Sequence, residues 1–181
     1  MRVISGSRKG RVLRLPRTKS IRPTTDRTKE FIFNYIGEWI KESFVLDLFA
    51  GSGNLGIEAL SRGASNSVFV DIDRNHCKVI KKNLELTNLT SLSKIVVSDV
   101  FKYLNSISGK KQKFDVIFAD PPYLSNYHVK ILEIFNEVDI LYDEGILILE
   151  HSSRLNLSNE MDLQLMKHKK MGDTSISIYK K

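Results

Sequence analysis

The sequence predicts an α/β fold in which helices cover both faces of a mostly parallel, doubly wound, seven-stranded sheet. Three observations predict it: apolar segments of strand length alternate with amphipathic segments from residue 44 to about residue 151, a glycine-rich turn follows the first apolar segment, and two alternating segments end the chain as a hairpin. The chain has 181 residues, which suits one well-buried domain. We therefore expect one domain over residues 1–181, with a basic hairpin over residues 1–25 as an appendage.

The composition narrows the classes of protein that the chain can be. No apolar run approaches the ~18 residues of a membrane span, and the Arg-rich N-terminus has no apolar segment typical of a secretion signal, so we expect a cytoplasmic protein without a membrane partner. Cys77 is the one cysteine, and the four histidines lack metal-ligand spacing, so neither a disulfide nor a metal site is predicted. The net charge of +7 indicates an acidic partner such as nucleic acid.

The N-terminal segment predicts a basic hairpin. Two short segments with strand-like alternation, residues 2–4 and 11–15, flank a Gly-Ser-Arg-Lys-Gly turn. No acid occurs among the first 25 residues, whereas the cations are Arg2, Arg8, Lys9, Arg11, Arg14, Arg17, Lys19 and Arg22. This distribution favours an arm that grips phosphates, and the alternative is a solvated basic tail.

The segment Arg22-Pro-Thr-Thr-Asp-Arg27 leads into a predicted helix over residues 26–41. The apolar stripe of this helix is typical of core packing and consists of Phe31, Ile32, Tyr35, Ile36, Trp39 and Ile40. Asp26 is expected as the N-cap or as a first-turn acid, and Thr24 and Thr25 can serve the same free N–H groups.

Strands and helices then alternate, which is the pattern of right-handed crossovers in a parallel sheet. The predicted strands cover residues 44–49, 67–72, 94–98, 114–119 and 145–150. The predicted helices cover residues 55–62, 74–87, 100–106 and 127–138. Residues 163–169 and 175–180, separated by Met-Gly-Asp, are expected to pair as an antiparallel hairpin at one edge.

The first predicted strand runs into the sequence LDLFAGSGNLG, which begins at Leu46 and ends at Gly56. Glycines allow a tight turn and the approach of a ligand to the start of a helix. The pattern matches G-x-G-x-x-G, and Asp71 follows Gly51 by 20 residues, as the ribose-binding acid of an NAD-dependent dehydrogenase would. Asp47 lies inside the strand, where a carboxylate suits a methionine amine or a sulfonium better than a dinucleotide.

The fourth predicted strand ends in FDVIFADPPY, residues 114–123. The two prolines hold the carbonyls of Asp120 and Pro121 outward, because proline fixes φ and disfavours a helical residue before it. These acceptors can hold an exocyclic amino group, and the ring of Tyr123 can stack on a base. The alternative is a structural turn with a capping Asp.

The glycine-rich turn resembles motif I, and DPPY resembles motif IV, of the class I, S-adenosylmethionine-dependent amino-methyltransferases, which have a Rossmann-like fold. The resemblance implies that Asp71 holds the ribose hydroxyls and that Asp99 reads the adenine amine, although Asp99 also suits a helix N-cap. The cofactor residues that it implies are Asp47, Phe49, Ala50, Gly51, Ser52, Gly53, Asp71, Ile72, Asp99 and Val100. Asp73 is equally suited to be a helix N-terminal acid.

RVISGSRKGRVLRLP, RPTTDRTKEFIFNYI, VDIDRN and the two motifs together resemble, over residues 1–151, the RsmD family of bacterial 16S rRNA guanine-N2 methyltransferases. The resemblance implies methyl transfer to the 2-amino group of one guanine, guanine 966 in the usual bacterial numbering, within an assembling 30S particle. It implies a monomer that uses no metal. The alternatives are an adenine-N6 methyltransferase of nucleic acid and a non-catalytic RNA-binding module on the same fold.

Two further groups of residues complete the predicted site. The expected catalytic residues are Asp120, Pro121, Pro122 and Tyr123. The expected RNA-binding residues are Arg2, Arg8, Lys9, Arg11, Arg22, Thr24 and Arg27. The segment around Arg22 and Arg27 is expected over the cofactor and the target base, with one of the two arginines on a phosphate.

Overall fold

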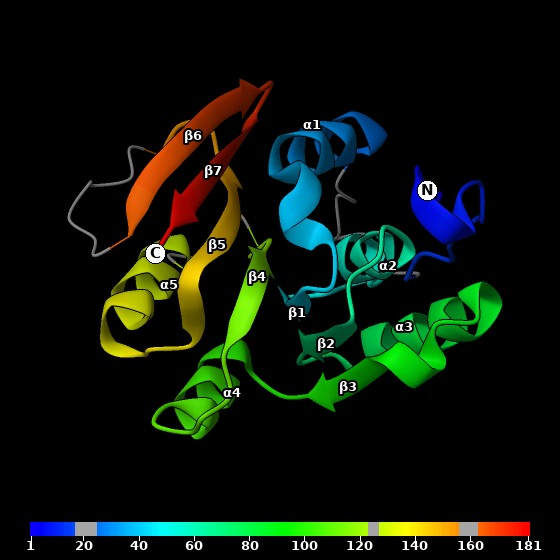
Figure 1. Cartoon of the computed structure of the whole chain (residues 1–181), viewed down its shortest axis with the longest axis horizontal. Helices are drawn as coiled ribbons and strands as arrows, with labels where there is room; N and C mark the ends of the chain where they lie inside the picture. Colours follow the sequence, from blue (N-terminus) through cyan, green and yellow to red (C-terminus); the bar gives the residue numbers. More distant parts are fainter. Residues whose placement is uncertain (17–24, 123–126, 156–162) are drawn as a thin grey trace.

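A seven-stranded mixed sheet forms the centre of the computed structural model, which describes residues 1–16, 25–122, 127–155 and 163–181 (Figure 1). The strands are β1 (Phe44–Leu48), β2 (Asn66–Asp71), β3 (Ser93–Val97), β4 (Phe114–Ala119), β5 (Leu141–Ser152), β6 (Gln164–Met171) and β7 (Thr174–Lys180). They lie in the order β3-β2-β1-β4-β5-β7-β6. The first five are parallel, and β7 pairs antiparallel with both β5 and β6. The predicted fold class is thus confirmed.

Helices cover both faces of the sheet. They are α1 (Asp26–Ile36), α2 (Asn54–Ser61), α3 (Arg74–Thr87), α4 (Val100–Ile107) and α5 (Tyr127–Glu137). Buried residues of α1, α2 and α3 belong to one hydrophobic cluster, and those of α4 and α5 belong to a second cluster. The sheet therefore separates two cores. Among the described residues, no helix is both long and apolar enough to span a membrane.

Strand β4 shows why these residues form a central strand. Val116 and Phe118 point into the first cluster, whereas Phe114, Ile117 and Ala119 point into the second. All five side chains are at most 1% exposed. Burial of a large apolar side chain contributes about 1.5–3 kcal/mol, so an unbroken apolar run is stable only in a strand that is covered on both faces.

Helix α1 is shorter than predicted. It begins after Thr25, whose hydroxyl accepts a hydrogen bond from the Thr28 N–H at 3.2 Å, so Asp26 is a first-turn acid and Thr25 is the N-cap. The α-helix ends at Gly37, where φ is +40°, and the chain continues as a 3₁₀ helix, Gly37–Ile40. The predicted end at residue 41 missed this change because the apolar stripe continues through it. A glycine accommodates the positive φ.

The N-terminal segment, residues 1–16, forms one antiparallel bridge, Arg2 to Val12, around a short 3₁₀ turn, in place of the two predicted strands. The segment was expected to be an appendage outside the core, but two of its side chains are part of the core. Val3 and Leu13 are 1% and 3% exposed and belong to the first cluster. The segment therefore packs against the helices on this face.

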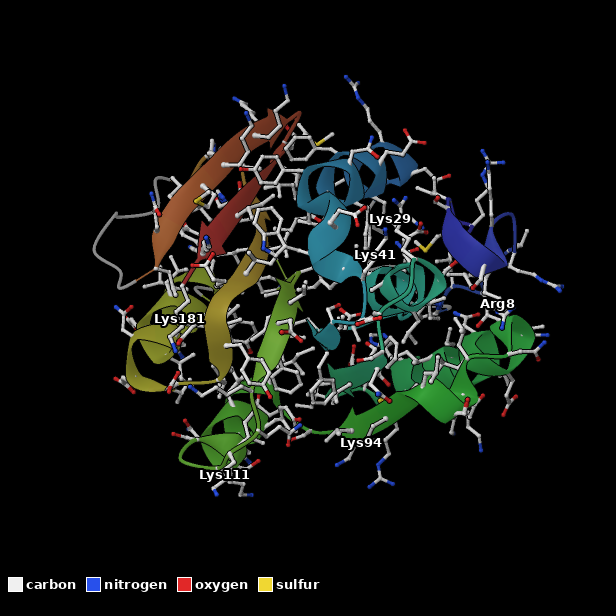
Figure 2. All side chains as sticks on the ribbon, viewed as in Figure 1. Arg8, Lys29, Lys41, Lys94, Lys111 and Lys181 are labelled. Carbon is white, nitrogen blue, oxygen red and sulfur yellow. The ribbon has the colours of Figure 1, made fainter. Side chains whose placement is uncertain are left out.

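A buried charge network attaches this segment to α1 and α2. The Lys29 side chain is 0% exposed, and its ammonium group donates to Glu58 at 3.2 Å, to Asn54 Oδ1 at 2.7 Å and to the Arg2 carbonyl at 2.6 Å. Glu58 also accepts from Arg62 Nε at 2.8 Å. Burial lowers the pKa of Lys29, and the Glu58 carboxylate partly offsets this effect. Figure 2 shows Lys29 directed between α1 and α2.

Two backbone N–H groups of the N-terminal segment complete the network. Ile4 and Ser5 donate to the Glu58 carboxylate at 2.8 and 3.0 Å. Ser61, one turn further along α2, accepts from the Arg8 N–H at 2.9 Å and donates to the Ser5 carbonyl at 2.6 Å. The path of residues 2–8 thus follows α2 because α2 supplies the partners for its backbone.

Candidate active site

The candidate site lies at the carboxyl edge of the sheet, where the strand order changes direction. From β1 the chain proceeds to β2 on one side, whereas β4 lies on the other side. Such a switch point is where open α/β sheets bind ligands. Leu48 of β1 pairs with Ala119 of β4, so the residues that follow them, Phe49 and Asp120, leave neighbouring strands at the same level.

The glycine-rich turn after β1 is tightly wound. Phe49, Gly51 and Gly53 have φ of +57°, +55° and +76°, and the Gly53 N–H donates to the Ala50 carbonyl at 2.7 Å. A Cβ at Gly53 would lie 3.2 Å from a methyl of Ile80. Gly53 then serves as the N-cap residue of α2. The predicted strand end at residue 49 is one residue too long because Phe49 already has the left-handed conformation.

Asp71, at the end of β2, holds this turn. Its side chain accepts from the Gly51 N–H at 2.8 Å and from the Asp73 N–H at 2.8 Å, and it lies 3.1 Å from Nδ1 of His76. Asp73 also caps α3, accepting from the Asn75 N–H at 2.7 Å. The predicted acid is thus beside the turn, although Asp71 is 6% exposed.

His76 is a further member of the site, which the sequence did not predict. It lies on the first turn of α3, and its Nε2 is 3.5 Å from Asp73 Oδ2. The signal was its spacing, because a residue three positions after a helix N-cap lies over that cap. His76 therefore joins both acids of the VDIDRN sequence.

Asp47 is placed behind the turn. Its carboxyl group is 3% exposed and accepts from the Gly56 N–H in α2 at 2.9 Å. Burial raises the pKa of Asp47 to about 8, and the Gly56 hydrogen bond opposes this rise. Asp47 therefore positions the turn against α2, and its expected contact with a methionine amine stays a prediction.

The remaining predicted cofactor residues differ in accessibility. Ile72 is 69% exposed beside Asp71, which leaves an apolar side chain at the site. Asp99 accepts from the Lys102 N–H at 3.0 Å and caps α4, as its alternative interpretation proposed. By contrast, the side chains of Ala50, Ser52 and Val100 are at least 92% buried. Only backbone atoms of these three residues can reach a ligand, those of Ala50 and Ser52 at the turn and those of Val100 at the start of α4.

Three aromatic rings meet at the same edge. Phe49 lies 5.7 Å from Tyr127 and 6.3 Å from Phe101, and the rings of Phe101 and Tyr127 are 5.2 Å apart. Phe101 and Tyr127 are not among the predicted site residues. Both occur in the first turns of helices that follow strand ends, and that position is the signal that could have found them.

The predicted catalytic sequence follows β4 directly. Asp120 is partly exposed, Pro121 is buried and Pro122 is exposed. Tyr123 lies outside the described residues. The expected pairing of Asp120 with an aromatic face therefore stays a prediction.

The predicted RNA-binding residues fall into two regions. Arg2, Lys9 and Arg11 are exposed on the N-terminal segment. Arg8, which Figure 2 labels, is partly buried there, and its N–H donates to Ser61 of α2 at 2.9 Å. Arg27 is at the start of α1, beside the turn between β6 and β7, and follows Asp26, which lies 3.8 Å from Arg2 Nε. Two other predicted residues, Arg22 and Thr24, fall outside the described part of the chain.

The residues at this edge fit a nucleoside whose flat base lies against an apolar side chain. Exposed Ile72 offers a surface for the base, the adjacent acid Asp71 is suited to hydroxyl groups, and the turn brings the backbone N–H groups at the start of α2 to the same edge. In the described part of the chain, no group of three or more His, Cys, Asp or Glu side chains is arranged to hold a metal ion.

Comparisons with known proteins place the chain among close relatives. The family described as Conserved hypothetical protein 95 matches residues 1–180. The chain is 41% identical to YlbH of Bacillus subtilis over 182 residues, which cover 100% of this chain and 99% of that protein. It is 32% identical to the Ribosomal RNA small subunit methyltransferase D of Haemophilus influenzae, over 99% of this chain and 93% of that protein. The solved structure of Escherichia coli yhhF superposes with a TM-score of 0.86 at 30% identity, with 100% and 97% covered.

Proposed function

Because the chain belongs to the Conserved hypothetical protein 95 family, the family of the RsmD methyltransferases, we propose that it transfers a methyl group from S-adenosylmethionine to the N2 amine of a guanine in 16S rRNA. The observation that carries the proposal is the pairing of Leu48 with Ala119. This pairing places the glycine-rich turn and Asp120 side by side at the switch point. A nucleoside held by the turn and an amine held by Asp120 would therefore be neighbours.

The cofactor would lie along the ends of β1, β2 and β3. Asp71 would hold the ribose hydroxyls, Ile72 would contact the adenine face, and the turn around Gly51 would lie against the methionine moiety. S-adenosylmethionine supplies, when bound, a methyl group on a sulfonium, and transfer breaks the S–CH₃ bond and releases the neutral thioether S-adenosylhomocysteine. Because this thioether is a good leaving group, we infer that no metal ion is needed. Asp99 retains its cap and would reach the adenine amine with its second oxygen.

The end of β4 would hold the guanine. The amine of guanine is a weak nucleophile because its lone pair is delocalised into the ring. The Asp120 carboxylate and the Pro121 carbonyl would accept its two N–H bonds and orient the nitrogen, and Tyr123 would stack on the base. Methylation requires the nitrogen to lose one proton, which passes to Asp120 or to water.

The RNA substrate and the particle that contains it are inferred from the same family. We infer that the substrate is 16S rRNA within a 30S particle or an assembly intermediate, with guanine 966 as the target. The net charge of +7 and the name of the Haemophilus influenzae relative support an RNA substrate. We further infer a cytoplasmic monomer whose residues 1–181 form one methyltransferase domain.

A transfer assay with labelled cofactor tests the proposal. Tritium from methyl-labelled S-adenosylmethionine should enter 16S rRNA of small-subunit particles that lack the modification, and nucleoside analysis should find it in N2-methylguanosine. Asp120→Ala should reduce transfer by about 10²-fold or more while cofactor binding is retained. Label in N6-methyladenosine would instead support the adenine alternative.

Asp143→Ala is the matched control, because Asp143 is 97% exposed at the opposite end of β5. It should leave transfer unchanged. Absence of label with every small-subunit substrate, despite bound cofactor, would favour a non-catalytic RNA-binding module. Equal activity of Asp120→Ala and Asp143→Ala would remove the role given to Asp120.

A further inference from the structure

A groove lies between the start of α1 and the turn that joins β6 to β7. It encloses a cavity of about 380 Å³, whose lining includes Arg27 from α1, Lys169 and Lys170 from β6, and Gly172 from the turn. Its residues come from segments that are about 140 positions apart in the sequence, and Figure 1 shows α1 beside the tip of this hairpin. The glycine-rich turn and Asp71 lie elsewhere on the edge, so the groove is separate from the proposed cofactor site.

The orientation of α1 against β6 explains how the groove is formed. Tyr35 donates a hydrogen bond from its hydroxyl to the Met166 carbonyl at 3.3 Å, which joins the end of α1 to the start of β6. Arg27 is eight residues, about two helical turns, before Tyr35, so both lie on the same side of α1. Lys169 pairs with Ile176, whose side chain belongs to the cluster under α1. Arg27 and Lys169 therefore occupy opposite walls.

The charge of the groove is positive. Within the described residues, no ion pair engages Arg27, Lys169 or Lys170, although other exposed lysines such as Lys41 do form ion pairs. Glu150 is the one lining residue with a carboxylate, and it is 93% buried and already interacts with another residue. Lys170 pairs with Ser175 and therefore points to the other face of β6, whereas Arg27 and Lys169 face the cavity. Two cations beside a carboxylate that is already engaged attract an anion.

The groove begins next to the proposed target-base site. Ala119 of β4 pairs with Leu149 of β5, so Asp120 and Glu150 leave neighbouring strands at the same level. Neighbouring strands are about 4.8 Å apart, which is less than the length of one nucleotide. A strand of RNA whose base reached Asp120 would thus carry a neighbouring phosphate over the groove.

We propose that this groove binds backbone phosphates of the RNA strand next to the methylated nucleotide, with Lys169 as a contact in addition to the predicted Arg27. This inference rests on the proposed function for the identity of the RNA, but the contact itself is with phosphate and needs no particular sequence. The turn between β6 and β7 would then act as one wall of the RNA path.

Salt-dependent binding of an oligouridylate strand tests the groove independently of methyl transfer. Each phosphate contact on a single strand contributes about 0.7 to the slope of log affinity against log salt. The double variant Arg27→Gln/Lys169→Gln should therefore lower this slope by about 1.4 and weaken binding about 25-fold at ~0.1 M salt. The same variant should transfer methyl groups to small-subunit particles with a raised KM, and its binding of S-adenosylmethionine and its Tm should equal those of the wild type.

Lys110→Gln/Lys111→Gln is the matched control. It removes the same charge from two adjacent exposed lysines after α4, far from the β6–β7 turn in Figure 2. The control should change binding less than about twofold. Equal losses in both doubles, or no loss in the groove double, would overturn the inference. If the wild type transferred no methyl group but only the groove double lost oligouridylate affinity, the groove would stand and the proposed function would fall.

Discussion

Replacement of Glu58 by glutamine tests whether the buried charge network attaches the N-terminal segment to α2. Glu58 accepts four hydrogen bonds, from the N–H groups of Ile4 and Ser5, from Lys29 and from Arg62. Each carboxylate oxygen accepts two of them. Glutamine replaces one oxygen by an NH₂ group, which is itself a donor, so the two donors that this oxygen bound would lose their acceptor. Lys29 would also stay buried without its counter-charge.

The expected cost is large because both effects act on fully buried groups. Removal of one partner of a buried ion pair costs about 3–5 kcal/mol. Lys29→Met should cost at least about 1 kcal/mol less, since Glu58 would keep the Arg62 guanidinium and two N–H donors. The double variant should cost less than the sum of the two, with a coupling energy of about 1–3 kcal/mol.

Urea unfolding at pH 7 measures these free energies, and amide hydrogen exchange at Ile4 and Ser5 reports the attachment directly. Glu38→Gln is the control, since its ion pair with Lys41 joins two exposed side chains, and it should cost less than about 1 kcal/mol. A loss for Glu58→Gln no larger than that of the control, or unchanged exchange at both amides, would refute this account of the network.

Three further predictions concern the sheet and its turn. The pKa of Asp47 is raised to about 8 in the folded protein, so the wild type should lose about 1.4 kcal/mol of unfolding free energy per pH unit as the pH rises from about 4 to about 8. Asp47→Asn should remove this pH dependence. Urea unfolding of both proteins at pH 5 and pH 8 would show the difference. Burial lowers the pKa of His151 to about 4, so this residue contributes stability above about pH 6.5 that is lost as the pH falls toward 4. Between pH 7 and pH 4.5, the Tm of His151→Gln should therefore fall less than the Tm of the wild type. Gly56→Ala should cost about 1–3 kcal/mol in urea unfolding, because its Cβ would lie 2.4 Å from the Phe69 ring.

The sequence predicted where the strands lie along the chain and that most of them are parallel, because burial on both faces leaves a plain signal. The predicted range of β4 agrees with the structure at both ends, since an apolar run stops at a double proline. The extent of β5 was underestimated: it begins at Leu141 and includes polar residues such as Asp143 and Glu144. Those residues lie in the irregular stretch between the Phe114–Leu141 and Val116–Ile146 pairs, where Glu144 has a φ of +68°. Such a bulge extends a strand without the apolar pattern that predicts one.

The candidate site was predicted in type more than in detail. A motif names residues that are close to a turn, but which side of the strand faces a ligand depends on the pleat. Asp47 shows this, because it points toward α2 and holds Gly56. The partnership of Lys29 with Glu58 joins helices that are separated by a strand and a turn, so no spacing rule within one helix could have found it.

The position of β7 has a consequence for synthesis. Strand β7 follows β6 in the chain and pairs on one side with β5 and on the other with β6, so among the described residues β6 has no partner in the sheet until β7 has been translated. A nascent chain interrupted by a premature stop codon after β6 would leave the edge of β5 bare and β6 unpaired. Such an unpaired edge invites association with other chains, so truncated products should aggregate rather than accumulate as shortened enzymes.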